Sequence, residues 1–330
     1  MIKKHAVTAL ALAAALIQGC EKKSSQTDAP AGQKRLHLAF VANSPGEYWA
    51  VVNLGCDIAA QQLGNVDVDF RFPESASIEA QEKLISNLIA AGVDGIAISP
   101  IDADKQSSFL DSVAAKTLLI CADSDAPQSK RVSYIGTDNL IAGTEAATLI
   151  KTALPQGGKV ALFAGYSKAQ NTKDRAEGIR RGLAGSNIEI VEMFEDGQSQ
   201  SVAAGKMAAA VSKYPDLAGA IGLSGYHGPA LTKASHSLGK NGKIKIVCFD
   251  DNSDTLTAIA SGEIHGTIAQ KPFEIGKRTI VHMANHLRGD KTQFSNTTMH
   301  TASRVLTKDN VEHYVAQQRN ISVFLKDKAF

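Results

Sequence analysis

The feature that most constrains the fold is a repeated alternation of short apolar strands with amphipathic helices. The first run predicts strands at 36–42, 66–71, 95–99, 117–122 and 132–135, with helices at 49–63, 78–91, 103–115 and 139–152. The second run predicts strands at 159–164, 189–194, 217–222, 244–249 and 266–270, with helices at 172–182, 201–213, 229–238, 252–262 and 272–288. Units of this kind form parallel sheets covered by helices and joined by right-handed crossovers. The chain is therefore predicted to be α/β, with two similar lobes and short tail elements at 303–306 and 310–315.

Two consecutive strands of the second run end in polar side chains. Asp250 follows an apolar strand, and Gln270 ends the next strand just before Pro272. The carboxyl ends of parallel strands are where open α/β sheets bind ligands. Two interpretations stay open on the pattern alone: these residues bind a ligand, or Asp250 only caps a helix and Gln270 only ends a strand.

The first 19 residues resemble a secretory signal. Lys3 and Lys4 precede an apolar run at 6–17, which is too short for a membrane-spanning helix, and small residues lead to Cys20. A cysteine at this place resembles a bacterial lipoprotein signal, in which Cys20 becomes acylated. The alternative is ordinary secretion with a free Cys20 thiol. Residues 20–35 are polar and are expected to form a flexible tether.

Charge and motif content exclude several classes of function. The chain has 35 basic and 33 acidic residues, and loss of Lys3 and Lys4 leaves 33 of each. The mature chain therefore has no excess of positive charge that would favour binding of nucleic acid. Cys56, Cys121 and Cys248 lie apart in apolar segments and are expected to be small core residues. We therefore predict no metal and no cofactor.

Catalytic motifs are also missing from the sequence. It contains no phosphate loop, no dinucleotide-binding glycine motif after the first strand, and no nucleophile elbow. His282 and His286 have a spacing that could bind a metal, but no third ligand or general base accompanies them, and a solvated helix face is the preferred interpretation. The chain is predicted not to be an enzyme.

Polar and aromatic side chains instead recur at strand ends and helix starts of both runs. They are Asn43, Tyr48, Trp49, Ser99 and Asp123 in the first run, and Lys173, Arg175, Tyr226, Asp250 and Gln270 in the second. Carboxylates, amides and guanidinium groups pair with adjacent hydroxyls, while aromatic faces pack on C–H surfaces. This mixture suits a small polyhydroxyl ligand. Alternatively, Tyr48 and Trp49 only pack at the start of their helix.

Six motifs in order make the chain similar to the periplasmic sugar-binding proteins of ABC importers, of the ribose/galactose-binding type. They are NSPGEYW at 43–49, GVDGIAISP at 92–100, IGTDN at 135–139, NTKDRAEG at 171–178, VCFD at 247–250 and TIAQKP at 267–272. The resemblance implies two Rossmann-like lobes joined by a three-strand hinge, with sugar buried between them. It divides the chain into 36–137 with 271–299 and 138–270 with 300–330.

The resemblance also assigns roles to individual residues. Tyr48 and Trp49 match the aromatic pair that sandwiches the sugar, Asp123 and Asp250 match the two strand-end aspartates, and Gln270 matches the hinge glutamine. Three positions depart from the ribose-type pattern: Ser124 and Lys173 stand where arginines are expected, and Tyr226 stands where an asparagine is expected. A sugar other than ribose is therefore expected.

The same resemblance implies partners and a location. We expect a monomer, tethered by lipid in the periplasm or at the cell surface, that delivers its sugar to an ABC permease. The alternative is a protein that presents its liganded form to a membrane sensor kinase.

Overall fold

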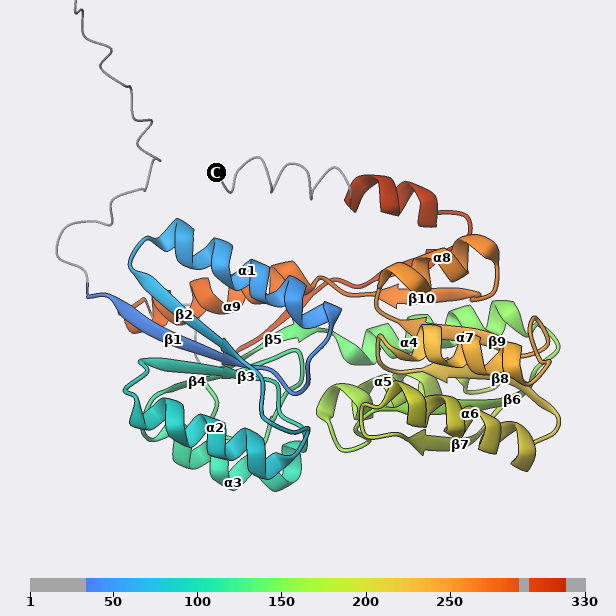
Figure 1. The fold of residues 1–330 in the computed structure, drawn as a ribbon, viewed down its shortest axis with the longest axis horizontal. Helices are drawn as coiled ribbons and strands as arrows, with labels where there is room; N and C mark the ends of the chain where they lie inside the picture. The colour runs from blue at the N-terminus through green and yellow to red at the C-terminus, as the bar shows by residue number, and fades with distance from the viewer. Residues whose placement is uncertain (1–33, 291–296, 319–330) are drawn as a thin grey trace, which may run out of the picture.

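The computed structural model describes residues 34–290 and 297–318, which form two lobes side by side (Figure 1). Each lobe is built on a six-stranded sheet with helices on both faces. Three connections join the lobes, so the predicted α/β fold of two lobes and a three-strand hinge is confirmed.

The first lobe has an entirely parallel sheet in the order β11-β5-β4-β3-β1-β2. Its strands are β1 (Leu36–Val41), β2 (Val66–Arg71), β3 (Gly95–Ile98), β4 (Leu118–Ala122), β5 (Ser133–Thr137) and β11 (Thr297–Thr301). Helices α1 (Glu47–Leu63) and α9 (Pro272–Leu287) cover one face, and α2 (Ile78–Ala90) and α3 (Ala103–Ala114) cover the other (Figure 1). α9 thus returns to the first lobe from the end of the second run.

The second lobe repeats this plan with the order β12-β10-β9-β8-β6-β7. Its strands are β6 (Gly158–Ala164), β7 (Ile188–Glu195), β8 (Leu217–Gly222), β9 (Lys245–Phe249), β10 (Gly266–Ala269) and β12 (Arg304–Thr307). Helices α4 (Asn139–Ala153) and α5 (Gln170–Leu183) pack on one face. On the other lie α6 (Gln200–Lys213), α7 (His227–Ser237), α8 (Ser253–Ser261) and a helix at 311–318.

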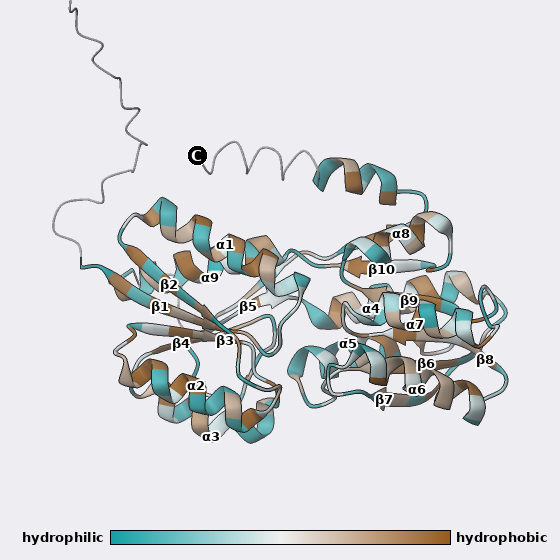
Figure 2. Cartoon of the chain, viewed as in Figure 1, coloured by the Kyte–Doolittle hydropathy of each residue, from teal (hydrophilic) through white to brown (hydrophobic). Residues whose placement is uncertain are grey.

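The apolar strand sequences follow from burial on both faces of each sheet. On β1, Leu38 and Phe40 join the core under α1 and α9, while Ala39 and Val41 join the core under α2 and α3. Figure 2 shows the same division, with apolar colour concentrated on the strands and polar colour on outward helix surfaces. The central strands are therefore fixed by packing from two sides.

Glycines allow the closest helix pair in each lobe to form. A Cβ on Gly55 of α1 would lie 2.2 Å from the Phe273 carbonyl oxygen of α9. A Cβ on Gly143 of α4 would lie 2.2 Å from the Arg175 carbonyl oxygen of α5. Because real Cβ atoms do not approach backbone this closely, both crossings require glycine. The second crossing also fixes the position of Arg175.

One strand departs from the predicted parallel arrangement. β12 pairs antiparallel with β10, whereas all other pairs in its sheet are parallel. β11 leaves the first sheet at the edge that faces the second lobe, and residues 302–303 carry the chain across. The parallel strands of the second sheet end on the side that faces the first lobe. A strand that starts on that side therefore runs antiparallel to its neighbours. The connection therefore dictates the strand's direction.

Candidate ligand-binding site

Two aspartates occupy equivalent places in the two lobes. Asp123 follows β4 with φ of 65°, and Asp250 follows β9 with φ of 68°. The Asp123 N–H donates to the Ile135 carbonyl at 3.0 Å, and the Asp250 N–H donates to the Ile268 carbonyl at 2.9 Å. The left-handed region is uncommon for residues other than glycine and concentrates at functional sites. The internal repeat thus aims one carboxylate from each sheet toward the gap between the lobes.

Polar side chains of both lobes hold the Asp123 carboxylate. The Tyr48 hydroxyl donates to Oδ1 at 2.8 Å, and the Ser99 hydroxyl donates to Oδ2 at 2.9 Å. Asn43 Nδ2 donates to Ser99 Oγ at 3.2 Å, and Asn171 Nδ2 of α5 reaches Asp123 Oδ2 at 3.3 Å. Burial raises the pKa of Asp123, against the opposing effects of Arg175, Tyr48 and Ser99. Both lobes therefore contribute to one carboxylate.

Gln270 links Asp250 to the hinge. Gln270 Nε2 donates to Asp250 Oδ1 at 2.6 Å, while its Oε1 accepts from the Thr137 hydroxyl at 2.7 Å. Burial raises the pKa of Asp250 to about 6, although Arg175 and Gln270 oppose the shift. Thr137, the last residue of β5, thus holds Gln270, and Gln270, just after β10, holds Asp250 where the chain crosses between the lobes.

Arg175 provides a buried donor near both carboxylates. Its Nε donates to Asn139 Oδ1 at 2.8 Å, its Nη1 donates to the Leu223 carbonyl at 2.7 Å, and the guanidinium lies 4.3 Å from the centre of the Phe249 ring. Nη2 is buried and has no hydrogen-bond partner among the described residues. An unsatisfied buried donor is costly, so this group favours a ligand oxygen.

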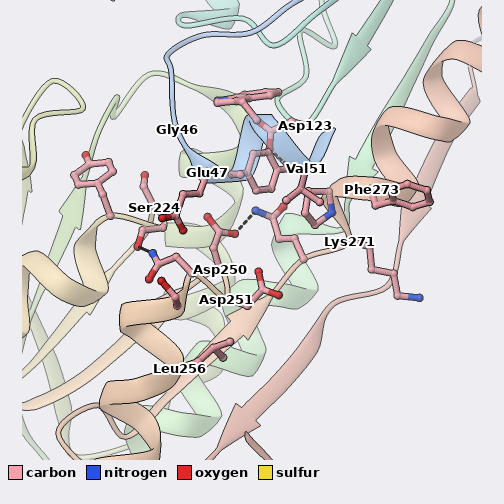
Figure 3. A pocket seen from close by; sticks show the side chains of 18 of the residues that line it. Gly46, Glu47, Val51, Asp123, Ser224, Asp250, Asp251, Leu256, Lys271 and Phe273 are labelled. Atoms are coloured by element: carbon pink, nitrogen blue, oxygen red, sulfur yellow. Dashed lines mark hydrogen bonds between the residues drawn. The ribbon is translucent and has the colours of Figure 1, made fainter. Parts of the chain in front are cut away.

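A cavity of about 980 Å³ brings these residues together between the lobes. Figure 3 shows Asp123, Asp250 and Ser224 around this space. Its lining includes these of the predicted residues: Asn43, Tyr48, Trp49, Asp123, Arg175, Tyr226, Asp250 and Gln270. The volume lies at the upper end of the range for small-molecule pockets. The cavity is large enough for a small polyhydroxyl ligand.

Three predicted residues lie outside the lining of this cavity. Ser99 is fully buried and supports Asp123 from behind. Ser124 is also fully buried, and its Oγ has no hydrogen-bond partner in the part of the chain that the structure describes. Lys173 instead forms an ion pair with Asp104 of the first lobe at 2.8 Å. Of the two basic residues predicted to bind the ligand, Lys173 and Arg175, only Arg175 thus lines the cavity.

The two aromatic residues of α1 have different surroundings. Trp49 is only 5% exposed. It packs edge-on against Phe40 in the core under α1 and α9, with 5.9 Å between the ring centres. Tyr48 is half-buried, and its ring is nearly perpendicular to that of Trp49, at 88°. Two perpendicular rings cannot both lie flat on one flat ligand ring. At most one of the two rings can therefore stack face-on against a ring bound here.

Some residues that line or support the cavity were not predicted as site residues from the sequence. Asn171 and Asn139 belong to motifs noted in the sequence, but their contacts with Asp123 and Arg175 depend on how α5 and α4 pack. Asn171, Ser224 and Asn252 line the cavity; Ser224 lies in the loop after β8, and Asn252 caps the N-terminus of α8. Only the strand-end position of Ser224 offered a signal.

Other predictions concern metals, membranes and the N-terminus. Among the described residues, no group of His, Cys, Asp or Glu is placed to hold a metal ion, and no helix has the length and apolar character needed to span a membrane. The interpretation of His282 as part of a solvated face is wrong: it is buried and lies 2.9 Å from Ser133 Oγ. Cys20, the signal and most of the tether lie outside the described residues.

Comparison with known sequences decides the family. Residues 38–291 match the periplasmic binding protein domain. The chain belongs to this family. The predicted resemblance is thereby confirmed, and so is the prediction that the chain is a binding protein rather than an enzyme.

Individual relatives of this family member cover nearly the whole chain. The ribose import binding protein RbsB of Bacillus subtilis is 24% identical over 88% of this chain and 96% of its own. The fructose import binding protein FruE of Bifidobacterium longum is 23% identical over 87% of this chain and 90% of its own. A solute-binding protein of an ABC transporter from Burkholderia graminis, solved with D-arabinose, is 29% identical with a TM-score of 0.78, over 84% of this chain and 96% of its own.

Proposed function

We propose that this chain captures a small sugar in the cavity between its lobes and delivers it to an ABC permease. The observation that carries this proposal is the paired arrangement of Asp123 and Asp250, one from each sheet, around a cavity that Arg175 also lines. Two carboxylates accept from ligand hydroxyls, and the unpartnered Arg175 Nη2 donates to a ligand oxygen. Relatives that import ribose and fructose support a sugar as the ligand class.

We further propose that the sugar is not ribose. Ser124 and Lys173 stand where the ribose-type pattern has arginines, and neither lines the cavity. The cavity therefore has no donor from either of these two positions. Tyr226 brings a phenol to the wall where the ribose-type pattern has an amide. A site built for one hydroxyl pattern rejects others strongly, because its buried polar groups are then left unpaired.

The proposal includes an anchored location. Acylation of Cys20 would attach the protein to a membrane, and residues 20–35 would tether the two-lobed domain, with 36–137 and 271–299 as one lobe and 138–270 and 300–330 as the other. In this arrangement a single chain, as a monomer, presents its cavity to the permease from the periplasm or the cell surface.

A second candidate is sugar sensing through a membrane receptor. The solved XylFII-LytSN complex contains a chain of the same fold, 26% identical with a TM-score of 0.76, covering 84% of this chain and 99% of that chain. A binding protein of this shape can therefore hand on its signal through protein contact. In a strain that lacks this chain, loss of radiolabelled sugar uptake supports delivery. Loss of a sugar-dependent transcriptional response with uptake intact supports sensing.

A thermal-shift screen tests sugar binding directly. The panel contains D-ribose, D-allose, D-fructose, D-arabinose, D-tagatose, D-galactose and common disaccharides. A sugar that binds only the native state stabilises it by about 2.7 kcal/mol when its concentration is 100 times its dissociation constant. The melting temperature then rises. We expect at least one sugar other than ribose to raise the melting temperature strongly. Asp250→Ala should abolish this rise. A panel without any shift would refute sugar capture.

A further inference from the structure

A buried polar cluster lies behind the second-lobe wall of the cavity. Asp196 directly follows β7, and its side chain has no exposed surface. His227 opens α7, also with no exposed side-chain surface, and its Nε2 lies 2.8 Å from Asp196 Oδ2. Tyr226, which lines the cavity, directs its hydroxyl to Asp196 Oδ1. None of these contacts was foreseen from the sequence.

The backbone fixes the protonation of His227. The Ser224 N–H donates to His227 Nδ1 at 2.9 Å. A backbone N–H can only donate, so Nδ1 carries no proton and accepts. In a neutral imidazole the proton then resides on Nε2, which donates to Asp196. The ring is thus held as one tautomer by a main-chain group.

Asp196 consequently accepts from every side. Besides His227 Nε2, the Gln198 N–H donates to Oδ1 at 3.1 Å, and the Tyr226 hydroxyl donates to the same oxygen. An ionised carboxylate only accepts hydrogen bonds, and burial with three donors satisfies it. The proton of the Tyr226 phenol is therefore committed to Asp196.

The cavity side of this wall then has one hydrogen-bond acceptor, the Tyr226 oxygen. With its proton committed, the Tyr226 oxygen presents only lone pairs to other partners. Because Tyr226 lines the cavity, its oxygen is a hydrogen-bond acceptor at this wall.

We propose that Asp196 and His227 are positioning residues that fix Tyr226 as a hydrogen-bond acceptor, so that a bound sugar must present a hydroxyl donor to this wall. The inference rests on the proposed sugar capture and deepens it, because it assigns the polarity of one subsite. Arg175 supplies the opposite polarity, a donor, elsewhere in the cavity.

The first experiment locates the protons without any sugar. Nitrogen-15 NMR of the full chain, with the signals assigned through His227→Gln, reports the tautomer of His227. We expect an unprotonated Nδ1, a protonated Nε2 and an exchange-protected Tyr226 hydroxyl proton that disappears in Tyr226→Phe. A proton on Nδ1, or a freely exchanging phenol, would overturn the assignment.

The second experiment reads the subsite polarity with ligand analogues. Each sugar that shifts the melting temperature in the panel is compared with its monodeoxy and monodeoxyfluoro derivatives, because fluorine replaces the hydroxyl but cannot donate. At one position both derivatives should lose about tenfold in affinity, the scale of one hydrogen bond. In Tyr226→Phe both losses at that position should fall below about twofold.

Tyr214→Phe is the matched control, because the Tyr214 hydroxyl bonds Glu192 at 3.0 Å and does not line the cavity. It should keep the wild-type pattern. A fluoro derivative that binds like the parent at the Tyr226-dependent position would overturn the acceptor assignment. If no sugar in the panel binds, sugar capture fails, and the NMR result still decides the proton positions.

Discussion

At the scale of single residues, Asp250 couples the cavity to pH. Its folded-state pKa of about 6 exceeds the ordinary value of 3.8, because burial disfavours the charged form. Between these two values the folded protein holds a proton that the unfolded chain has released. The unfolding free energy contributed by this group is therefore fully present below pH 3.8 and is lost as pH rises through about 6.

Asp250→Asn should remove this dependence. The wild type should lose up to about 3 kcal/mol of stability relative to the variant between pH 4 and pH 7, since one pKa unit equals about 1.4 kcal/mol. Urea unfolding at several pH values measures the difference. Asp309→Asn, on an exposed turn outside the cavity, is the control and should parallel the wild type. A constant difference between Asp250→Asn and wild type would contradict the assignment.

Much of the site could be predicted at this scale, for an identifiable reason. Asp123, Asp250 and Gln270 end apolar strands, and the ends of parallel strands meet along one edge. Lys173 and Arg175 could not be separated by sequence alone, because both open the same helix. Two residues apart on a helix point in different directions, and only the packing of α5 shows which one faces the cavity.

At the scale of elements, contacts between the lobes bias the molecule toward closure. Lys173 of α5 pairs with Asp104 of α3 at 2.8 Å, and the Tyr166 hydroxyl donates to the Ala76 carbonyl at 3.2 Å. Each contact joins a residue of the second lobe to a residue of the first lobe, and neither involves the three hinge connections. They favour the closed arrangement without touching the ligand.

Lys173→Ala should weaken sugar binding slightly and in a salt-dependent way. The pair is partly exposed, with 29% and 68% of its side-chain surface accessible, so its stabilisation is about 0–1 kcal/mol and the affinity loss at most about fivefold. Calorimetry at low salt and at 1 M salt, where charges are screened within about 3 Å, should show the loss only at low salt. Lys213→Ala breaks a pair with Glu192 inside the second lobe and should leave affinity unchanged. An equal loss in both variants would argue against a role in closure.

The elements themselves divide into predictable and unpredictable ones. β3 is a continuous apolar run, and β1 and β9 are apolar apart from His37 and Lys245, because these strands are buried on two faces. β11 was not predicted, since its sequence TTMHT is not apolar and the strand lies at an edge of its sheet. The antiparallel direction of β12 depends on where the chain crosses between lobes, which no local pattern records.

At the scale of the whole molecule, anchoring depends on one side chain. If Cys20 is acylated, Cys20→Ser should remain a soluble precursor without incorporated fatty acid, because two acyl chains give stable attachment where one is marginal. Metabolic labelling followed by membrane fractionation measures this. Ser24→Ala, in the same segment, should label normally. Label that persists in Cys20→Ser would refute the lipoprotein signal.

Closure of the two lobes is the motion that sugar capture requires. A ligand shifts this equilibrium only if it binds the closed form better than the open one, and contacts from both lobes provide that difference. Asp123 and Asp250 lie on opposite sides of the cavity, and Gln270 holds Asp250 where the chain crosses between lobes. The rotation should be taken up at the three crossings, near residues 138, 271 and 302–303.

A sugar from the panel should therefore reduce the radius of gyration measured by solution scattering. Trp49, the only tryptophan, lines the cavity and packs on Tyr48, so its fluorescence should change over the same concentration range. Asp250→Ala, which lacks the second-lobe carboxylate, should show neither change at that concentration. A fluorescence change without any decrease in radius would mean that the sugar binds to the first lobe alone, and two-lobe closure would then be refuted.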